Sequence, residues 1–280
     1  MSKIQKRITI IAIASLIVVL SLIYPFFLLG EKVALGFERW VPDYEMSDIS
    51  SLLEKDELSS NDYNALYLQT GLMPTAIDEL LKSSHGKEDI LKIQKSFFTD
   101  YEIDDDNFGP FTHYYEIEGE HPIAPLQNGD IIVSSSTEFS WWTMGHCAMV
   151  IDAEKGIVLE VNGYGDTSSR SYLHSIRKRG NFMVLRPNID KDDVDKIVQY
   201  TVDNLLGIKY DATIGVLSRK YNEEIKYSQC AHIFWYAFYK FGYDIDSNGG
   251  TIVVPKNIAN SQYFDIVQVA GFNPYTLWGD

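Results

Sequence analysis

The apolar and polar positions of the chain follow a different pattern in each of its parts, and the first part is the most uniform. From Ile8 to Leu29 the chain is apolar without a charge. At 1.5 Å per residue, a helix of this length crosses the hydrocarbon core of a bilayer. Lys3, Lys6 and Arg7 precede the run, and by the positive-inside rule they hold the N-terminus in the cytoplasm. We therefore expect a single-pass membrane anchor with the remaining chain outside, and a cleaved signal peptide is the alternative.

A helical segment is predicted next. Residues 31–47 have the character of a short linker, and apolar residues then recur at helical spacing from Met46 to about Leu81 and from about Lys87 to Phe98. Neither stretch has enough apolar residues to bury a core alone, so we expect both to pack on a later sheet.

From residue 126 the apolar positions change to the spacing of strands. The predicted strands are 131–133, 146–151, 157–161, 182–185, 251–254 and 265–269. Tight turns between short strands indicate antiparallel pairing, and an amphipathic helix is predicted over 192–206. The expected fold class is α+β: an antiparallel sheet packed against a helix, preceded by a helical segment and the N-terminal transmembrane helix.

The helix expected to cover the sheet begins near Cys230. Apolar residues follow helical spacing from there to Phe241, Ser228 is the expected N-cap, and Gly242 is the expected stop. Free backbone N–H groups and the helix dipole lower the pKa of a thiol in a first helical turn. Cys230 is therefore a candidate nucleophile, and a buried structural cysteine is the alternative.

Charge excludes one class of partner. The net charge of −15 makes nucleic acid an unsuitable ligand. Arg170, Arg177, Lys178 and Arg179 form a local basic cluster, which we interpret as the solvated tip of a hairpin, with an anion-binding patch as the alternative. No cluster has the spacing of metal ligands, so neither metal nor cofactor is expected.

A thiol nucleophile needs a base and a group that orients the base. His146 begins one predicted strand and Glu160 lies on the next, so a hairpin can bring the carboxylate to the imidazole N–H. An exposed strand carboxylate is the alternative for Glu160. Because side chains alternate along a strand, Cys147 should face away from the group that His146 meets, and no Cys147–Cys230 disulfide is expected.

Five short motifs occur in an order that resembles a known family: Gly129-Asp130-Ile131-Ile132, Gly145-His146, Leu159-Glu160, Lys209-Tyr210-Asp211 and Ser228-Gln229-Cys230. Together they resemble the circularly permuted branch of the NlpC-type papain-like cysteine hydrolases, the YiiX/YebB-like proteins, which are related in fold to lecithin-retinol acyltransferases. The resemblance covers roughly residues 62–269. It departs from the family pattern after the cysteine, where Ala231 and His232 replace the usual serine and glutamate.

The resemblance implies a permuted papain-like domain over residues 48–280, after a cytoplasmic stub and anchor (1–30) and the linker (31–47). It implies Cys230 as nucleophile, His146 as base and Glu160 as the orienting residue. Tyr210, Trp141, Trp142 and Tyr227 are candidate substrate-binding residues, although each could equally pack in the core or at a rim.

The function expected from this resemblance is a membrane-anchored extracytoplasmic hydrolase that cleaves an amide or ester bond through a thioacyl intermediate. Its substrate would be a cell-wall peptide or an N-acyl or lipid compound. A catalytically silent envelope-binding module and a thiol acyltransferase are the alternatives.

Overall fold

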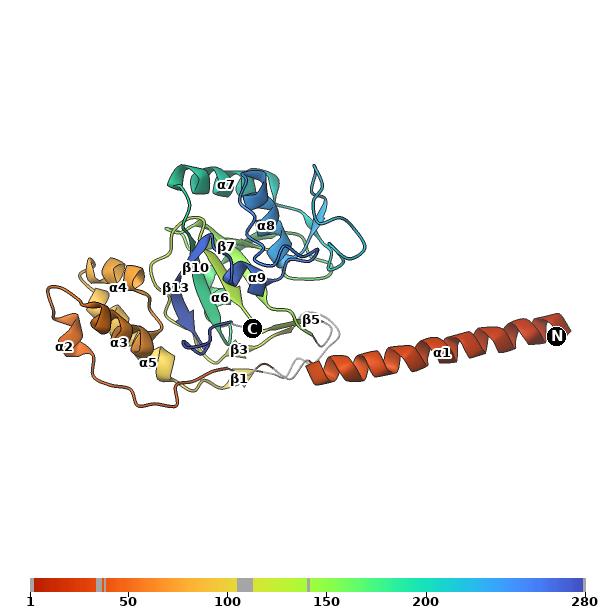
Figure 1. The fold of residues 1–280 in the computed structure, drawn as a ribbon, viewed down its shortest axis with the longest axis horizontal. Helices are drawn as coiled ribbons and strands as arrows, with labels where there is room; N and C mark the ends of the chain where they lie inside the picture. The colour runs from red at the N-terminus through yellow and green to blue at the C-terminus, as the bar shows by residue number, and fades with distance from the viewer. Residues whose placement is uncertain (1–2, 34–36, 38, 105–112, 140–141, 279–280) are drawn as a thin grey trace.

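The computed structural model describes residues 3–33, 37, 39–104, 113–139 and 142–278 (Figure 1). Its helices are α1 (Lys3–Val33), α2 (Ser50–Leu53), α3 (Ser60–Thr70), α4 (Pro74–Leu81), α5 (Gly86–Phe98), α6 (Leu173–Arg177), α7 (Lys191–Asn204), α8 (Cys230–Lys240) and α9 (Pro255–Ala259). Its strands are β1 (Ile103–Asp104), β2 (His113–Tyr114), β3 (Glu116–Ile117), β4 (Ile131–Ser134), β5 (Thr137–Phe139), β6 (Trp142–Thr143), β7 (His146–Asp152), β8 (Ile157–Glu160), β9 (Ser169–Tyr172), β10 (Phe182–Pro187), β11 (Lys209–Tyr210), β12 (Tyr227–Ser228) and β13 (Phe264–Ala270).

A six-stranded antiparallel sheet forms the centre of the molecule, in the order β13-β10-β4-β7-β8-β9. The long central strand β7 pairs with β4 on one side and with β8 on the other. The α+β architecture with an antiparallel sheet therefore follows the strand pattern of the sequence. The β7–β8 hairpin brings His146, the first residue of β7, and Glu160, the last residue of β8, to the same end of the hairpin.

The two faces of the sheet bury two separate hydrophobic clusters. Cys147 and Met149 point to the face covered by α7 and α8, and Phe234 of α8 packs in the same cluster. Ala148 and Val150 point to the other face, where the helices α3, α4 and α5 cover the sheet (Figure 1). Alternation of side chains along β7 thus assigns the two halves of the chain to opposite faces.

Most predicted elements coincide with observed ones, and one does not. The helices over 87–98 and 192–206 and the strands near 131, 146, 157, 182 and 265 are all present. Residues 251–254 form no strand, and they lead instead into α9, which has Pro255 in its first turn. The carbonyl of Val253 accepts a hydrogen bond from the side chain of Gln229, so this segment is joined to the N-cap of α8.

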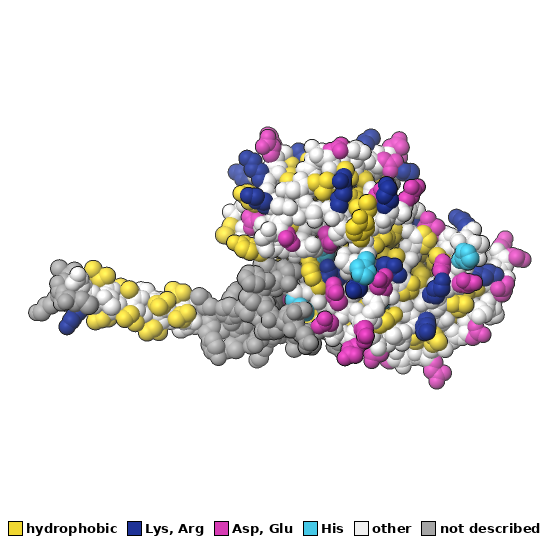
Figure 2. All heavy atoms as spheres, turned by 180° about the vertical axis from the view of Figure 1, so that it is seen from behind, with side chains coloured by type: hydrophobic (Ala, Val, Ile, Leu, Met, Phe, Trp, Pro, Cys, Tyr) yellow, Lys and Arg dark blue, Asp and Glu magenta, His cyan; other side chains and the backbone are white. Residues whose placement is uncertain are grey.

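The expected membrane anchor is contradicted. A span needs about 20 consecutive apolar residues in one helix, and within the described ranges no helix meets the length and apolarity that a membrane crossing demands. The single-pass topology, with a cytoplasmic N-terminus and an extracellular catalytic domain, falls with that finding. α1 is nevertheless a helix and extends away from the sheet (Figure 1). Over the rest of the molecule, acidic and basic side chains are interspersed on the face that Figure 2 shows.

Asp130, from the first of the five motifs, has a structural role. Its fully buried carboxylate accepts hydrogen bonds from Arg186 Nε at 3.0 Å and Nη2 at 2.9 Å. Arg186 also binds Glu79 of α4 through Nη1 at 3.0 Å. Burial raises the pKa of Asp130, against the opposing influence of Arg186. This bidentate pair joins β10 to the turn before β4 and to the helical segment.

Replacing Arg186 tests that connection. Arg186→Met leaves the Asp130 carboxylate buried without its partner, and we expect the free energy of unfolding to fall by about 3 kcal/mol. Urea denaturation of the purified chain measures the change. Lys155→Met is the matched control, because Lys155 pairs with Asp152 on the surface and its loss should leave unfolding unchanged. Equal stability of both variants would contradict the assignment.

Candidate active site

Cys230 is the first residue of α8. The N-cap is Gln229, whose side-chain Oε1 accepts from Ala231 N at 3.1 Å, so the expectation that Ser228 caps the helix is wrong. Ser228 Oγ instead lies 2.8 Å from His232 Nδ1. Gly242 follows the helix with a φ of 92°, as the predicted stop requires. The sulfur of Cys230 is held at the start of the helix, 3.6 Å from Gln229 Oε1.

His146 and Glu160 meet as the hairpin pattern predicts. His146 Nε2 lies 2.8 Å from Glu160 Oε2, and both side chains are almost fully buried. Ser171 on β9 donates to the other carboxylate oxygen at 2.5 Å. With Nε2 engaged by the carboxylate, Nδ1 is the ring atom that remains for a proton donor or acceptor.

Gly145 allows the turn that leads into β7 to lie close against β4 and Trp278. Its φ of 75° suits glycine, and a Cβ there would lie 2.7 Å from the Ser134 carbonyl oxygen. Cys230 Sγ lies 4.0 Å from the Gly145 carbonyl oxygen. The nucleophile candidate is therefore directly beside the residue that precedes His146.

The protonation states of Cys230, His146 and Glu160 depend on one another. The neighbouring Cys147 and then His146 hold the pKa of the Cys230 thiol well below its usual range, although burial opposes the shift. Burial alone would lower the pKa of His146, but its bonds to Cys230 and Glu160 raise it. Burial likewise opposes ionisation of Glu160, yet contact with His146 brings its pKa down to about 2. The arrangement favours a thiolate, an imidazolium and a carboxylate in sequence.

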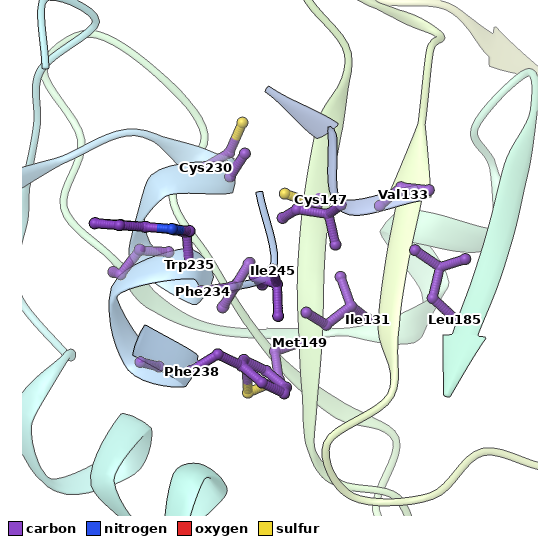
Figure 3. Close-up of a cluster of buried hydrophobic side chains, with 14 of the residues drawn as sticks. Ile131, Val133, Cys147, Met149, Leu185, Cys230, Phe234, Trp235, Phe238 and Ile245 are labelled. Atoms are coloured by element: carbon purple, nitrogen blue, oxygen red, sulfur yellow. The ribbon is translucent and has the colours of Figure 1, made fainter. Parts of the chain in front are cut away.

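Cys147 does not face away from Cys230, contrary to the expectation from strand alternation. It points from β7 toward α8, and both thiols are free and buried in one cluster (Figure 3). The alternation itself holds from Cys147 to Val150. His146 is the first residue of β7 and follows the turn at Gly145, and both Cys147 and His146 act on the pKa of Cys230.

A narrow pocket opens onto Cys230. Its walls include Gly145, Asn162, Tyr210 and Ile252. Tyr210, a predicted substrate-binding residue, therefore lies in the pocket, and its pKa is raised by burial and by the nearby Cys230. Tyr227 is half exposed and lines a separate neighbouring cavity, so the structure does not place it beside Cys230.

The structure describes the side chain of neither tryptophan predicted to bind substrate, Trp141 and Trp142. Trp141 lies outside the described residues, and of Trp142 only the backbone, in β6, is described. His232 is directed away from the site: its Nε2 lies 2.6 Å from the Lys220 carbonyl oxygen, and burial lowers its pKa to about 4.

Four residues near the base were not identified from the sequence. The ring of Tyr114 packs edge-on against His146 with centroids 5.6 Å apart, and its hydroxyl donates to Asn162 Oδ1 at 2.9 Å. Ser171 bonds Glu160, and Arg179 lies over the Tyr114 ring. Arg179 is only 3% exposed, so its interpretation as part of a solvated tip is wrong. A run of consecutive basic residues normally predicts a solvated surface, so nothing in the sequence indicates that Arg179 is buried.

The contribution of Cys147 can be measured on the thiol itself. Cys147→Ala removes a donor to the Cys230 thiolate, and we expect the acid limb of the rate of Cys230 alkylation by iodoacetamide to move up by about half a pH unit. Peptide mass spectrometry follows the modified residue. Cys147→Ser keeps a donor at nearly the same volume and should retain the limb of the unmodified chain. An identical shift in both variants would point to altered packing instead.

No family model, no curated protein and no solved structure matches the chain. The geometry around Cys230 therefore supports a functional proposal without help from a relative.

Proposed function

We propose that this chain is a cysteine hydrolase of the permuted papain-like kind, which cleaves an amide or ester bond through a thioacyl-enzyme. The observation that carries the proposal is that Cys230 of α8 and His146 of β7 line one pocket, while His146 Nε2 lies 2.8 Å from Glu160 Oε2 of β8. The order of these residues in the chain, with histidine and glutamate before cysteine, supports the permuted arrangement.

Each group has a distinct task in the proposed reaction. The Cys230 thiolate attacks the carbonyl carbon, and the His146 imidazolium gives its proton to the departing amine or alkoxide. A water molecule, deprotonated by His146, then attacks the thioester and releases the acid. Glu160 keeps the imidazole oriented and stabilises its charged form.

The helix start limits which donor can stabilise the oxyanion. The N–H of Ala231 already bonds to Gln229 Oε1, and the side-chain Nε2 of Gln229 donates to the Val253 carbonyl oxygen. The backbone N–H of Cys230 is therefore the first-turn donor assigned to the developing negative charge. The pocket rim carries Met144 and Ile252, which are 40% and 38% exposed. An apolar rim suits both a peptide with apolar side chains and an acyl group, the two substrate classes proposed.

The proposal is tested with the full chain and two substrate sets: cell-wall peptide fragments, and N-acyl amides with lipid esters. We expect acid release, and an acyl adduct on Cys230 in acid-quenched samples analysed by mass spectrometry. His146→Ala should lower the rate by at least about 100-fold, because general acid–base catalysis is lost. Cys230→Ala should abolish the adduct.

Two controls separate the alternatives. Cys147→Ser keeps the second thiol position polar and should retain turnover. Adding an amine acceptor distinguishes hydrolysis from transfer, since a hydrolase still releases the free acid. If iodoacetamide alkylates Cys230 slowly, and His146→Ala does not change that rate, the hydrolase proposal is contradicted and a binding module is favoured.

A further inference from the structure

The buried guanidinium of Arg179 is an unexplained charge next to the proposed site. Arg179 follows α6 and is 3% exposed, and its Nε and Nη1 are buried without a hydrogen-bond partner among the residues that the structure describes. Leaving two nitrogens of a buried guanidinium without hydrogen bonds costs free energy. A charge kept at that cost, beside a proposed catalytic group, calls for an electrostatic explanation.

The nearest groups connect Arg179 to the base. Its Cζ lies 3.3 Å from the centroid of the Tyr114 ring, and that ring packs edge-on against His146 at 5.6 Å. Tyr114 is fixed in turn by hydrogen bonds from its hydroxyl to Asn162 O at 3.1 Å and Oδ1 at 2.9 Å. One aromatic ring therefore separates the guanidinium from the imidazole and fixes the position of both.

Glu160 is the carboxylate on which the charge of Arg179 bears, and it lies 2.8 Å from His146 Nε2. The positive charge of Arg179 favours the ionised form of Glu160, in addition to the contacts with His146 and Ser171. Burial lowers the pKa of Arg179, but a guanidinium loses its proton only far above neutral pH, so Arg179 stays charged. Its other acidic neighbour is Glu116, whose Oε1 lies 3.7 Å from Nη1 and whose side chain is 37% exposed.

We propose that Arg179 is a positioning residue for the Cys230–His146 pair: its buried guanidinium, held on the Tyr114 ring, is the fourth member of a buried chain of alternating charges. The members are the Cys230 thiolate, the His146 imidazolium, the Glu160 carboxylate and Arg179. With all four ionised the buried cluster has no net charge. Without Arg179 it carries one uncompensated negative charge in a medium of low polarisability.

Loss of the Arg179 charge should move the acid limb of Cys230 reactivity to higher pH, whichever group takes up the proton. A cluster with excess negative charge binds a proton more readily, whether on Cys230 or on Glu160. Either event removes the reactive pair at a higher pH than in the unmodified chain. The ionisable groups around the pair are Cys147 on β7, Glu160 on β8, Tyr114 on β2 and Tyr210 on β11.

The test is the pH profile of Cys230 alkylation by iodoacetamide in the full chain. Arg179→Met keeps the length of the side chain but removes its charge, and we expect the acid limb to move up by about one pH unit. Arg179→Lys keeps the charge and should remain close to the unmodified profile. A purely structural role would lower the melting temperature of both variants and leave the limb in place.

A second variant has the opposite expected sign and does not disturb the core. Glu116→Gln removes a half-exposed negative charge near Arg179, so the limb should move down, by less than one pH unit. This result decides the question even where Arg179→Met does not fold. An unmoved limb in a folded Arg179→Met, or an upward shift in Glu116→Gln, overturns the proposal.

The proposal depends on the proposed function, and the two fail separately. If the unmodified chain shows no fast, His146-dependent alkylation, the hydrolase proposal fails. If that alkylation is present but the Arg179 and Glu116 variants do not shift its acid limb as expected, the positioning role alone fails.

Discussion

The contact between the first turn of α8 and the first residues of β7 is the constraint on which the site depends. Phe234 packs α8 into the cluster that holds Cys147 and Met149 of β7, and this burial fixes the height of the helix over the sheet. Cys230 then comes to lie 4.0 Å from the Gly145 carbonyl. Because the hydrophobic contact and the chemical contact lie on the same two elements, the core itself sets the geometry of the thiol.

Burial of the site makes its charges interdependent. A lone buried carboxylate or thiolate would bind a proton, because desolvation penalises the charged form. Here neighbouring groups oppose that effect: Cys147 and then His146 lower the pKa of Cys230, and His146 lowers the pKa of Glu160. The low polarity that would neutralise a single group therefore strengthens the attraction within the series.

The five motifs of the sequence separate into structural and chemical ones. Asp130 fixes Arg186 and through it α4, and it takes no part in the pocket. Tyr210, Gln229, His146 and Cys230 line the pocket, and Glu160 bonds His146 from behind it. A motif that places a residue near the reaction and a motif that supports the scaffold look alike in one sequence, and burial with partners distinguishes them.

The sequence by itself determined the elements and their faces, because these depend on local periodicity: the helix beginning at Cys230, the β7–β8 hairpin, and the encounter of His146 with Glu160. It did not determine the N-cap, the approach of Cys147 to Cys230 or the burial of Arg179. An apolar run of sufficient length also predicted a membrane span that the described helices do not provide. The approach of Cys147 to Cys230 and the burial of Arg179 depend on contacts between segments far apart in the chain, and only the packing of α8, β2 and β7 around one another decided them.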